Sequence, residues 1–357
     1  MKKTYILMMV MILTLSTLSL SGCSIFGKGS GKKEVKPMRD IPSTQLVKEM
    51  KTGWNLGNTL DATGAKGLEA ETSWGNPATT KEMIQVVKDA GFNTVRIPIT
   101  WDGHFGDAPD MERFAIINLH HEEWHFPSEE NFESANEMLI KIWEQIAERF
   151  EGYDEHLIFE AMNEPRLKGT ADEWNGGTPE AREIINRLNT TFHETIRNSG
   201  GKNPKRHLML PTYAASSDWV AIKDITLPED DKVIVSVHAY LPYRFALSDE
   251  KVLEWDADNV ADTRDIDNLM SLLDEHFISK DIPVIIGEYG ARNKYNLNAR
   301  VAWAHYYVGA AAEKGIPCIW WDNGAFVGSG ENFGLLNRTM LTWEYPEIID
   351  AIMEEVE

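Results

Sequence analysis

Residues 156–165 read His-Leu-Ile-Phe-Glu-Ala-Met-Asn-Glu-Pro, and they contain the pattern that decides the fold. A short, mostly apolar run (His156–Met162) suits a buried strand and is followed at once by polar residues and a proline. Seven more runs of this kind are predicted as strands: Gly53–Gly57, Thr94–Ile99, Phe114–His120, His207–Pro211, Val233–His238, Pro283–Glu288 and Ile316–Trp321. Amphipathic stretches separate most of them, which indicates βα units around a parallel sheet.

Helices are predicted in the intervening stretches. Thr79 to Glu82 has the form of a capping box, and Gly91 is typical of the stop after a helix that ends at Ala90. Apolar residues at helical spacing predict four more helices over Phe132–Phe150, Glu180–Arg197, Asp265–His276 and Val301–Glu313. Because no linker or change in composition divides the chain beyond its N-terminal segment, we expect one α/β domain, a (β/α)8 TIM barrel, over residues 41–357.

The connection between the second and third predicted strands is unusually short. Residues 101–113 supply only 13 positions, including two glycines and a proline. A parallel crossover needs about a dozen residues or more and usually contains a helix. Either the barrel lacks the helix between these strands, or an unusual loop leads to the third strand. We expect the helix to be missing, which would expose apolar surface on neighbouring elements.

The first 22 residues have the features of a targeting segment. Lys2 and Lys3 precede a mostly apolar run, and Leu20-Ser21-Gly22-Cys23 resembles a bacterial lipobox, in which the cysteine carries lipid. We predict a lipoprotein signal peptide over 1–22, lipidation of Cys23 and a flexible tether over 23–40. The alternative is an ordinary signal peptide with an incidental cysteine. The protein is expected at the extracellular face of a bacterial membrane, or secreted.

Composition limits the partners. A net charge of −21 repels phosphates, so nucleic acid is excluded and membrane association depends on the anchor. The 12 tryptophans suit the flat apolar faces of sugar rings, although core packing is the alternative for each of them. Cys318 is the only cysteine besides Cys23, so a disulfide framework and a Cys-based zinc site are excluded. Cys318 lies in an apolar run, and we expect it to be buried.

Polar side chains occur at or just after the ends of six predicted strands. The carboxyl ends of barrel strands open onto one face, so these residues should converge there. They are Arg96, His120, His121, Asn163, Glu164, His238, Tyr240, Glu288, Trp321 and Asp322.

Two glutamates at this face suit the cleavage of a glycosidic bond. That reaction needs an acid to protonate the departing oxygen and a second carboxylate across the sugar. Glu164 precedes Pro165, which stiffens the turn, and Glu288 follows a buried run. Gly287 removes bulk beside Glu288, which would let a substrate approach. The structural alternative for either glutamate is a salt-bridged strand end.

His120 and His121, followed by Glu122 and Glu123, also suggest a metal site. Adjacent residues on a strand point to opposite faces, so the two histidines are not expected to chelate one ion. No HExxH helix is present in the sequence. We expect no metal and no cofactor, with His120 directed into the mouth of the barrel.

Seven motifs, in order along the chain, resemble those of glycoside hydrolase family 5. They are GWNLGN at 53–58, RIP at 96–98, NLHH at 118–121, NEP at 163–165, HAY at 238–240, GEYG at 287–290 and WWDNG at 320–324. The first motif, together with Trp74-Gly75-Asn76-Pro77, is similar to the endoglucanase and xyloglucanase branch of that family.

The resemblance implies a retaining endo-β-1,4-glucanase that acts on cellulose-type glucans, with xyloglucan or mixed-linkage β-glucan as further substrates. It implies Glu164 as the general acid/base and Glu288 as the nucleophile, about 5–5.5 Å apart. Arg96 would keep Glu288 ionised, whereas Glu164 would need a raised pKa to stay protonated. The other residues expected to bind or orient the substrate are Asn55, Trp74, Arg96, His104, His120, His121, Asn163, His238, Tyr240, Trp321 and Asn323.

Within these roles, Arg96 and Tyr240 would orient Glu288, Asn163 would hold the sugar 2-hydroxyl, and Trp321 would stack under the ring. Two alternatives stay open: a β-mannanase with the same catalytic plan, and a surface lipoprotein that binds glucan without cleaving it. The expected partner is a β-glucan polysaccharide, and we expect a monomer.

Overall fold

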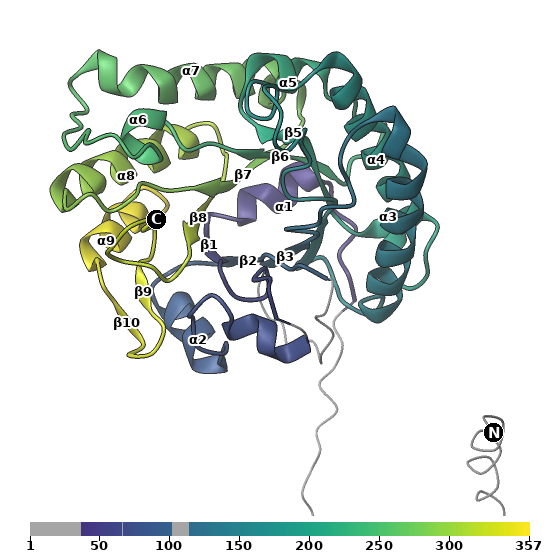
Figure 1. Cartoon of the computed structure of the whole chain (residues 1–357), viewed down its shortest axis with the longest axis horizontal. Helices are drawn as coiled ribbons and strands as arrows, with labels where there is room; N and C mark the ends of the chain where they lie inside the picture. Colours follow the sequence, from purple (N-terminus) through teal and green to yellow (C-terminus); the bar gives the residue numbers. More distant parts are fainter. Residues whose placement is uncertain (1–36, 66, 102–113) are drawn as a thin grey trace, which may run out of the picture. The chain divides into compact units, whose positions relative to one another are not determined.

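Eight parallel strands close into a barrel in the order of the sequence, which confirms the predicted TIM barrel (Figure 1). The computed structural model describes residues 37–65, 67–101 and 114–357. The strands are β1 (Thr52–Leu56), β2 (Thr94–Ile97), β3 (Phe114–Asn118), β4 (Leu157–Glu160), β5 (Leu208–Ser216), β6 (Val233–His238), β7 (Val284–Tyr289) and β8 (Cys318–Asp322). They are almost entirely buried, as expected for a parallel sheet covered on both faces.

Each predicted strand is present, with differences at the ends. The third strand stops at Asn118, so His120 lies beyond it and not within it. The fifth runs on to Ser216 through an irregularity, where Ala214 and Ala215 have positive φ angles of 54° and 46°. Few alanines adopt that conformation, so a pattern of apolar residues could not predict it.

Helices surround the barrel (Figure 1). The five predicted helices correspond to α2 (Lys81–Asp89), α3 (Glu129–Arg149), α4 (Pro179–Arg197), α7 (Val260–His276) and α8 (Leu297–Ala312). The Thr80 side chain accepts the Met83 N–H and so caps α2. The structure adds α5 (Trp219–Asp224), α6 (Tyr243–Ala246), α9 (Pro346–Glu354), three 3₁₀ turns (Gly67–Thr72, Asn203–Lys205 and Ile278–Lys280) and a hairpin of β9 (Leu336–Asn337) with β10 (Thr342–Trp343).

The short connection between β2 and β3 is described only at its start. Residues 98–101 contain no helix, and residues 102–113, which include the predicted sugar contact His104, lie outside the described part of the chain. Trp101 is buried, and its indole N–H donates to Asn118 O at 2.6 Å. Nearby on α3, Met138 is 41 % exposed.

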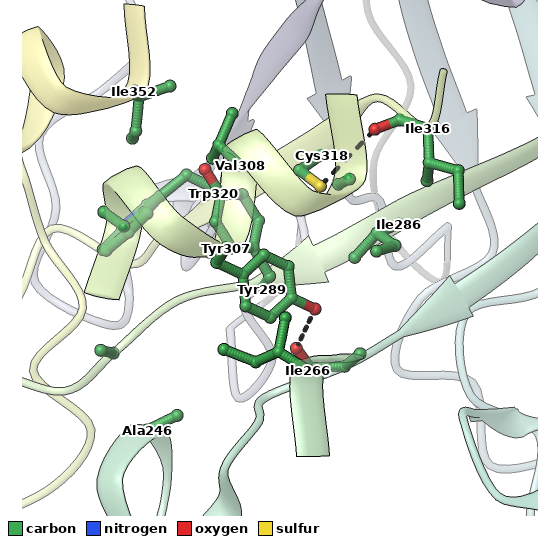
Figure 2. Close-up of a cluster of buried hydrophobic side chains, with 14 of the residues drawn as sticks. Ala246, Ile266, Ile286, Tyr289, Tyr307, Val308, Ile316, Cys318, Trp320 and Ile352 are labelled. Atoms are coloured by element: carbon green, nitrogen blue, oxygen red, sulfur yellow. Dashed lines mark hydrogen bonds between the residues drawn. The ribbon is translucent and has the colours of Figure 1, made fainter. Parts of the chain in front are cut away.

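An aromatic cluster packs β7 and β8 against the outer helices (Figure 2). The Tyr289 ring centroid lies 5.1 Å from that of Tyr307 and 5.4 Å from that of Trp320. Cys318 is buried in the same cluster, as predicted, and burial raises the pKa of its thiol. The cluster fixes the two strands that carry Glu288 and Trp321.

Helix α1 (Ser43–Glu49) closes the barrel at the amino ends of the strands, and Figure 1 shows it across the ring. Leu46, Val47 and Met50 pack against one buried residue from each of six strands: Ile116, Ile158, Met209, Ile234, Ile285 and Ile319. Ser43 N donates to Asp231 O, just before β6.

The residues before α1 are fastened to the barrel by ion pairs. Arg39 pairs with Glu49 at 2.8 Å and with Glu155, and Asp40 pairs with Lys205 at 2.7 Å. The predicted end of the tether at residue 40 is therefore too late, because these charges bind partners on the barrel. The predicted signal peptide, Cys23 and residues 24–36 lie outside the described residues. Within the described ranges, no helix is both long and apolar enough to cross a membrane.

Candidate active site

Glu164 and Glu288 meet at the carboxyl ends of the strands, as predicted. Glu164 follows β4, and Glu288 lies near the end of β7. One carboxylate oxygen of each glutamate and one ring nitrogen of His238 all lie within 4.8 Å of one another. The Glu164 side chain is 18 % exposed and that of Glu288 is 6 % exposed, so both are sheltered.

Glu288 is held at both oxygens. Arg96 Nη1 donates to Oε1 at 2.8 Å, and the Tyr240 hydroxyl donates to Oε2 at 2.9 Å. Arg96 is fully buried and touches Glu288, so it orients the glutamate and does not face a substrate. Although burial acts to lower the pKa of Arg96, the charges of Glu160 and Glu288 raise it, and the guanidinium stays cationic.

Glu164 is bonded mainly to His238. The histidine Nδ1 donates to Glu164 Oε1 at 2.9 Å and also lies 3.7 Å from Glu288 Oε2. Arg166 Nη1 lies 3.6 Å from Glu164 Oε2. His238 Nδ1 is therefore hydrogen-bonded to Glu164 and lies close enough to Glu288 to interact with its charge.

The charges of the free site differ from the expected ones. Burial raises the pKa of Glu288, and this outweighs the opposing charges of His238 and Arg96. Burial also acts to raise the pKa of Glu164, but the hydrogen bond and charge of His238 lower it below its usual value. Burial would lower the pKa of His238, yet the charge of Glu288 and the bond with Glu164 raise it. The expected order of the two glutamate pKa values is thus reversed in the free protein, because His238 holds a proton beside Glu164.

Asn55 and Asn163 were both predicted to contact the substrate, and both accept a hydrogen bond from Arg96. Only Asn163 lies beside Glu164, just after the end of β4. Arg96 Nη2 donates to Asn163 Oδ1 at 2.7 Å, which fixes the orientation of the amide. Asn55, predicted to bind substrate, is fully buried. Its Nδ2 donates to backbone oxygens of Gly287 and Ile319, and its Oδ1 accepts from Arg96. The prediction for Asn55 is wrong, since the residue supports Arg96 inside the barrel wall.

His120 and His121 lie in the turn after β3, and their rings contact edge to face with centroids 4.4 Å apart. The expectation that they point to opposite faces is wrong, because the strand ends before them. Candidate ligand atoms of Asp61, His120 and His121 lie within 4.8 Å of one another. Burial lowers the pKa of His120 well below its usual value and that of His121 to about 4, so both are neutral near pH 7.

The tautomer of His120 follows from its neighbour. Ile99 N donates to Asn118 Oδ1, and the Asn118 amide then donates to His120 Nδ1 at 3.2 Å. A neutral His120 that accepts at Nδ1 carries its proton on Nε2, where it can donate to a ligand.

Trp321 is placed by a close approach to Gly57. A Cβ on Gly57 would meet the Trp321 ring at 3.0 Å, so glycine is required where the indole crosses the end of β1. The Trp321 ring lies almost parallel to that of His120, with centroids 5.6 Å apart. Gly287 has a similar role: a Cβ there would lie 3.1 Å from His238 Nε2. The prediction that Gly287 makes room for a substrate is therefore wrong, because His238 occupies the space beside it.

Two cavities meet at Trp74 and His121. The larger, about 1210 Å³, is lined by His120, Glu164 and Arg166 and extends to Met138 on α3. The smaller, about 470 Å³, is lined by Trp321, Asn323 and Glu331. Trp74 is 42 % exposed and lies 5.5 Å from the His121 ring. Of the predicted substrate contacts, His120, His121, Trp74, Trp321 and Asn323 therefore line the cavities.

Three residues at the site were missed in the sequence. Glu160 and Ser236 lie inside predicted strands, and Arg166 follows the NEP motif. Glu160 is fully buried and bonded to Arg96. An acidic residue within an apolar strand was the available signal, because glutamate is almost never fully buried without a partner.

Comparisons with known proteins agree with this arrangement. The family described as "Cellulase (glycosyl hydrolase family 5)" matches residues 59–115 and 111–327, two segments that overlap at 111–115, where the short β2–β3 connection reaches β3. The chain is 48 % identical over 343 residues to Endoglucanase A of Ruminococcus albus, covering 89 % of this chain and 93 % of that protein. It is 46 % identical over 368 residues to Endoglucanase B of Neocallimastix patriciarum, covering 95 % and 76 %.

Solved structures show the same fold. A broad specificity endoglucanase from Ruminococcus champanellensis with bound cellotriose has a TM-score of 0.84 and 46 % identity, covering 89 % of this chain and 100 % of that one. A family 5 lichenase variant from Caldicellulosiruptor sp. F32 with cellotetraose has a TM-score of 0.83 and 42 % identity, covering 90 % and 97 %. With a family match across most of the barrel and relatives of this identity, the chain belongs to glycosyl hydrolase family 5, the cellulase family.

Proposed function

We propose that this protein is a retaining endo-β-1,4-glucanase in which Glu164 is the acid/base and Glu288 the nucleophile. The observation that carries the proposal is the approach of a Glu164 oxygen to a Glu288 oxygen within 4.8 Å. Retaining glycosidases place their carboxyl groups about 5–5.5 Å apart, whereas inverting ones leave about 6.5–9.5 Å for a water.

In the first step, a Glu288 oxygen attacks the anomeric carbon while the bond from that carbon to the leaving oxygen breaks. Glu164 gives its proton to the leaving oxygen. That proton can come from His238 Nδ1, which is 2.9 Å from Glu164 Oε1. When His238 is protonated, proton transfer along this bond leaves a neutral histidine and an acidic Glu164, while Glu288 must be ionised to attack.

In the second step, Glu164 accepts a proton from a water that attacks the anomeric carbon, and Glu288 departs as a carboxylate. Arg96 and Tyr240 hold the two Glu288 oxygens in both steps, so the carboxylate loses little freedom when it reacts. Asn163, fixed by Arg96, is placed to donate to a sugar 2-hydroxyl.

The substrate proposed is a β-1,4-linked glucan, with mixed-linkage β-glucan and xyloglucan as further substrates. The Trp321 face and the exposed Trp74 ring suit the apolar faces of glucose units. The cavities on both sides of His121 provide room for a chain of several sugars. Relatives described as endoglucanases and as a lichenase support the same class of substrate.

The test is reducing-sugar release from carboxymethylcellulose, mixed-linkage β-glucan, xyloglucan and mannan, measured side by side for the wild type and Glu288→Ala. We expect the wild type to act on the glucans and the variant to lose at least about 1000-fold in rate. Mannan as the sole substrate would point to a mannanase. Equal, background rates for both proteins on every polysaccharide would favour glucan binding without cleavage.

We also infer that Cys23 carries a lipid and anchors the protein at the outer face of a bacterial membrane. Support comes from the Leu-Ser-Gly-Cys sequence, which follows a mostly apolar run with lysines at its start.

The anchor is tested by expressing the full chain in a bacterium and separating membrane and soluble fractions. We expect the wild type in the membrane fraction with a lipid mass on Cys23, Cys23→Ser in the soluble or secreted fraction, and Ser24→Ala unchanged. A soluble wild-type protein without lipid would indicate an ordinary signal peptide.

A further inference from the structure

Glu160 is a fully buried acid that is linked to the reacting groups through Arg96 and does not line the cleft. It is the last residue of β4, and neither it nor its partner Arg96 has exposed side-chain surface. Arg96 Nε donates to Glu160 Oε2 at 2.7 Å, and the Ser236 hydroxyl donates to Oε1 at 2.6 Å. Both carboxylate oxygens therefore have a fixed donor.

Arg96 connects this buried acid to the reacting groups. Its Nε is bonded to Glu160, while Nη1 donates to Glu288 Oε1 and Nη2 donates to Asn163 Oδ1. A guanidinium is planar, so fixing the Nε edge also fixes the directions of the two terminal nitrogens. Glu160 thereby determines where the donors to Glu288 and Asn163 point.

Glu160 also shares the charge of Arg96. One buried cation lies between two carboxylates, at 2.7 Å from Glu160 and 2.8 Å from Glu288. If Glu160 were neutral, the whole cationic charge would act on Glu288. Glu288 would then ionise more readily and would be a weaker base toward the anomeric carbon.

We propose that Glu160 is a positioning residue for the reaction: through Arg96 it orients Glu288 and Asn163 and limits how strongly the guanidinium stabilises the Glu288 carboxylate. This proposal rests on the proposed glucanase activity. It assigns Glu160 no contact with the sugar, and its effect passes through Arg96 alone.

The pH dependence of this effect involves the titratable and charged groups that face Glu288 in the part of the chain that the structure describes. They are Arg96 on β2, Glu164 after β4, His238 at the end of β6, Tyr240 just after β6, and Glu331 after β8. Glu160→Gln changes none of them and removes one negative charge from the far side of Arg96.

The experiment compares kcat and kcat/KM across pH for the wild type, Glu160→Gln and the matched control Glu155→Gln, on a soluble mixed-linkage β-glucan. Glu155 is also a buried glutamate paired with an arginine, Arg39, but it lies at the opposite end of the barrel. Glu160→Gln should lower kcat about tenfold or more with a smaller change in KM, and should move the acidic limb of kcat/KM down by at least about half a pH unit. Glu155→Gln should lower the melting temperature and leave the acidic limb in place.

A second variant, Ser236→Ala, separates the effect of Glu160 on the orientation of Arg96 from the effect of its negative charge. It removes the hydrogen bond to Glu160 Oε1 and keeps every charge, so kcat should fall several-fold with no movement of the acidic limb. It also carries the test if Glu160→Gln does not fold. An unmoved acidic limb in a folded Glu160→Gln, or a wild-type kcat in Ser236→Ala, overturns the proposal. An inactive wild type would overturn the proposed glucanase activity instead.

Discussion

The Tyr240 hydroxyl donates a 2.9 Å hydrogen bond to Glu288 Oε2, while Arg96 occupies Oε1. The bond favours the ionised carboxylate and so opposes the burial that raises the pKa of Glu288. The nucleophile must be ionised to react, so the activity of the free protein should rise with pH through this raised pKa.

Tyr240→Phe removes that bond without changing the shape of the ring. The pKa of Glu288 should rise further, and the acidic limb of kcat/KM should move up by about one pH unit. Activity would fall most at acid pH and least near the optimum. Initial rates on mixed-linkage β-glucan across pH would check this, and an acidic limb at the wild-type position would contradict the assigned role of Tyr240. The shift is opposite in sign to that expected for Glu160→Gln.

Glu164→Gln should slow the cleavage of a substrate more strongly when its leaving group is less acidic. Loss of the acid should slow the release of a sugar alcohol by about 100- to 10,000-fold, whereas release of a nitrophenolate needs no protonation and should be affected far less. Rates on cello-oligosaccharides and on a nitrophenyl cellobioside give the comparison. Equal losses on both substrates would show that Glu164 is not the acid.

Gly57→Ala should impair the site through Trp321. The added Cβ would meet the indole at 3.0 Å and the Asp322 carbonyl at 2.9 Å, so the ring has to shift. Displacement of a stacking platform should lower kcat/KM about tenfold, mainly through KM. Gly152→Ala is the control, because a Cβ there has no neighbour within 4 Å. Equal kinetics for the two variants would argue against Trp321 as the platform.

Leu46→Ala tests the closure of the barrel by α1. Leu46 is fully buried against the strand residues at the amino end, so the substitution should cost about 2–5 kcal/mol in unfolding free energy. Because this end lies opposite the active site, kcat at low temperature should stay close to that of the wild type. Lys48→Ala, at an exposed position of the same helix, is the control. A wild-type melting temperature for Leu46→Ala would show that α1 does not stabilise the barrel.

The barrel could be predicted because its strands are short apolar runs that end in polar residues. This pattern identified the strand before Glu164 and the strand that contains Glu288. It could not identify α1, because this helix has seven residues and only two of them, Leu46 and Val47, are apolar. It also could not show that His120 and His121 lie beyond a strand, because the end of β3 depends on pairing with β2 and β4.

The candidate site was predictable in its chemistry and less so in its contacts. Glu164, Glu288 and Tyr240 follow from their motifs. Asn55 was misassigned because a polar residue in a motif could equally bind sugar or support Arg96, and only burial distinguishes the two. The raised pKa of His238 could not be predicted from residue types, since it depends on distances of 2.9 and 3.7 Å to two carboxylates.

Trapping the covalent intermediate tests the central claim most directly. A 2-deoxy-2-fluoro cellobioside with a good leaving group should glycosylate the nucleophile and then hydrolyse slowly, because the fluorine destabilises the cationic transition states. Peptide mass spectrometry should find one fluorocellobiosyl group on Glu288, and Glu288→Gln should remain unlabelled. A label on another residue, or an active wild type that is never labelled and releases product of inverted configuration, would contradict the pairing of Glu164 with Glu288.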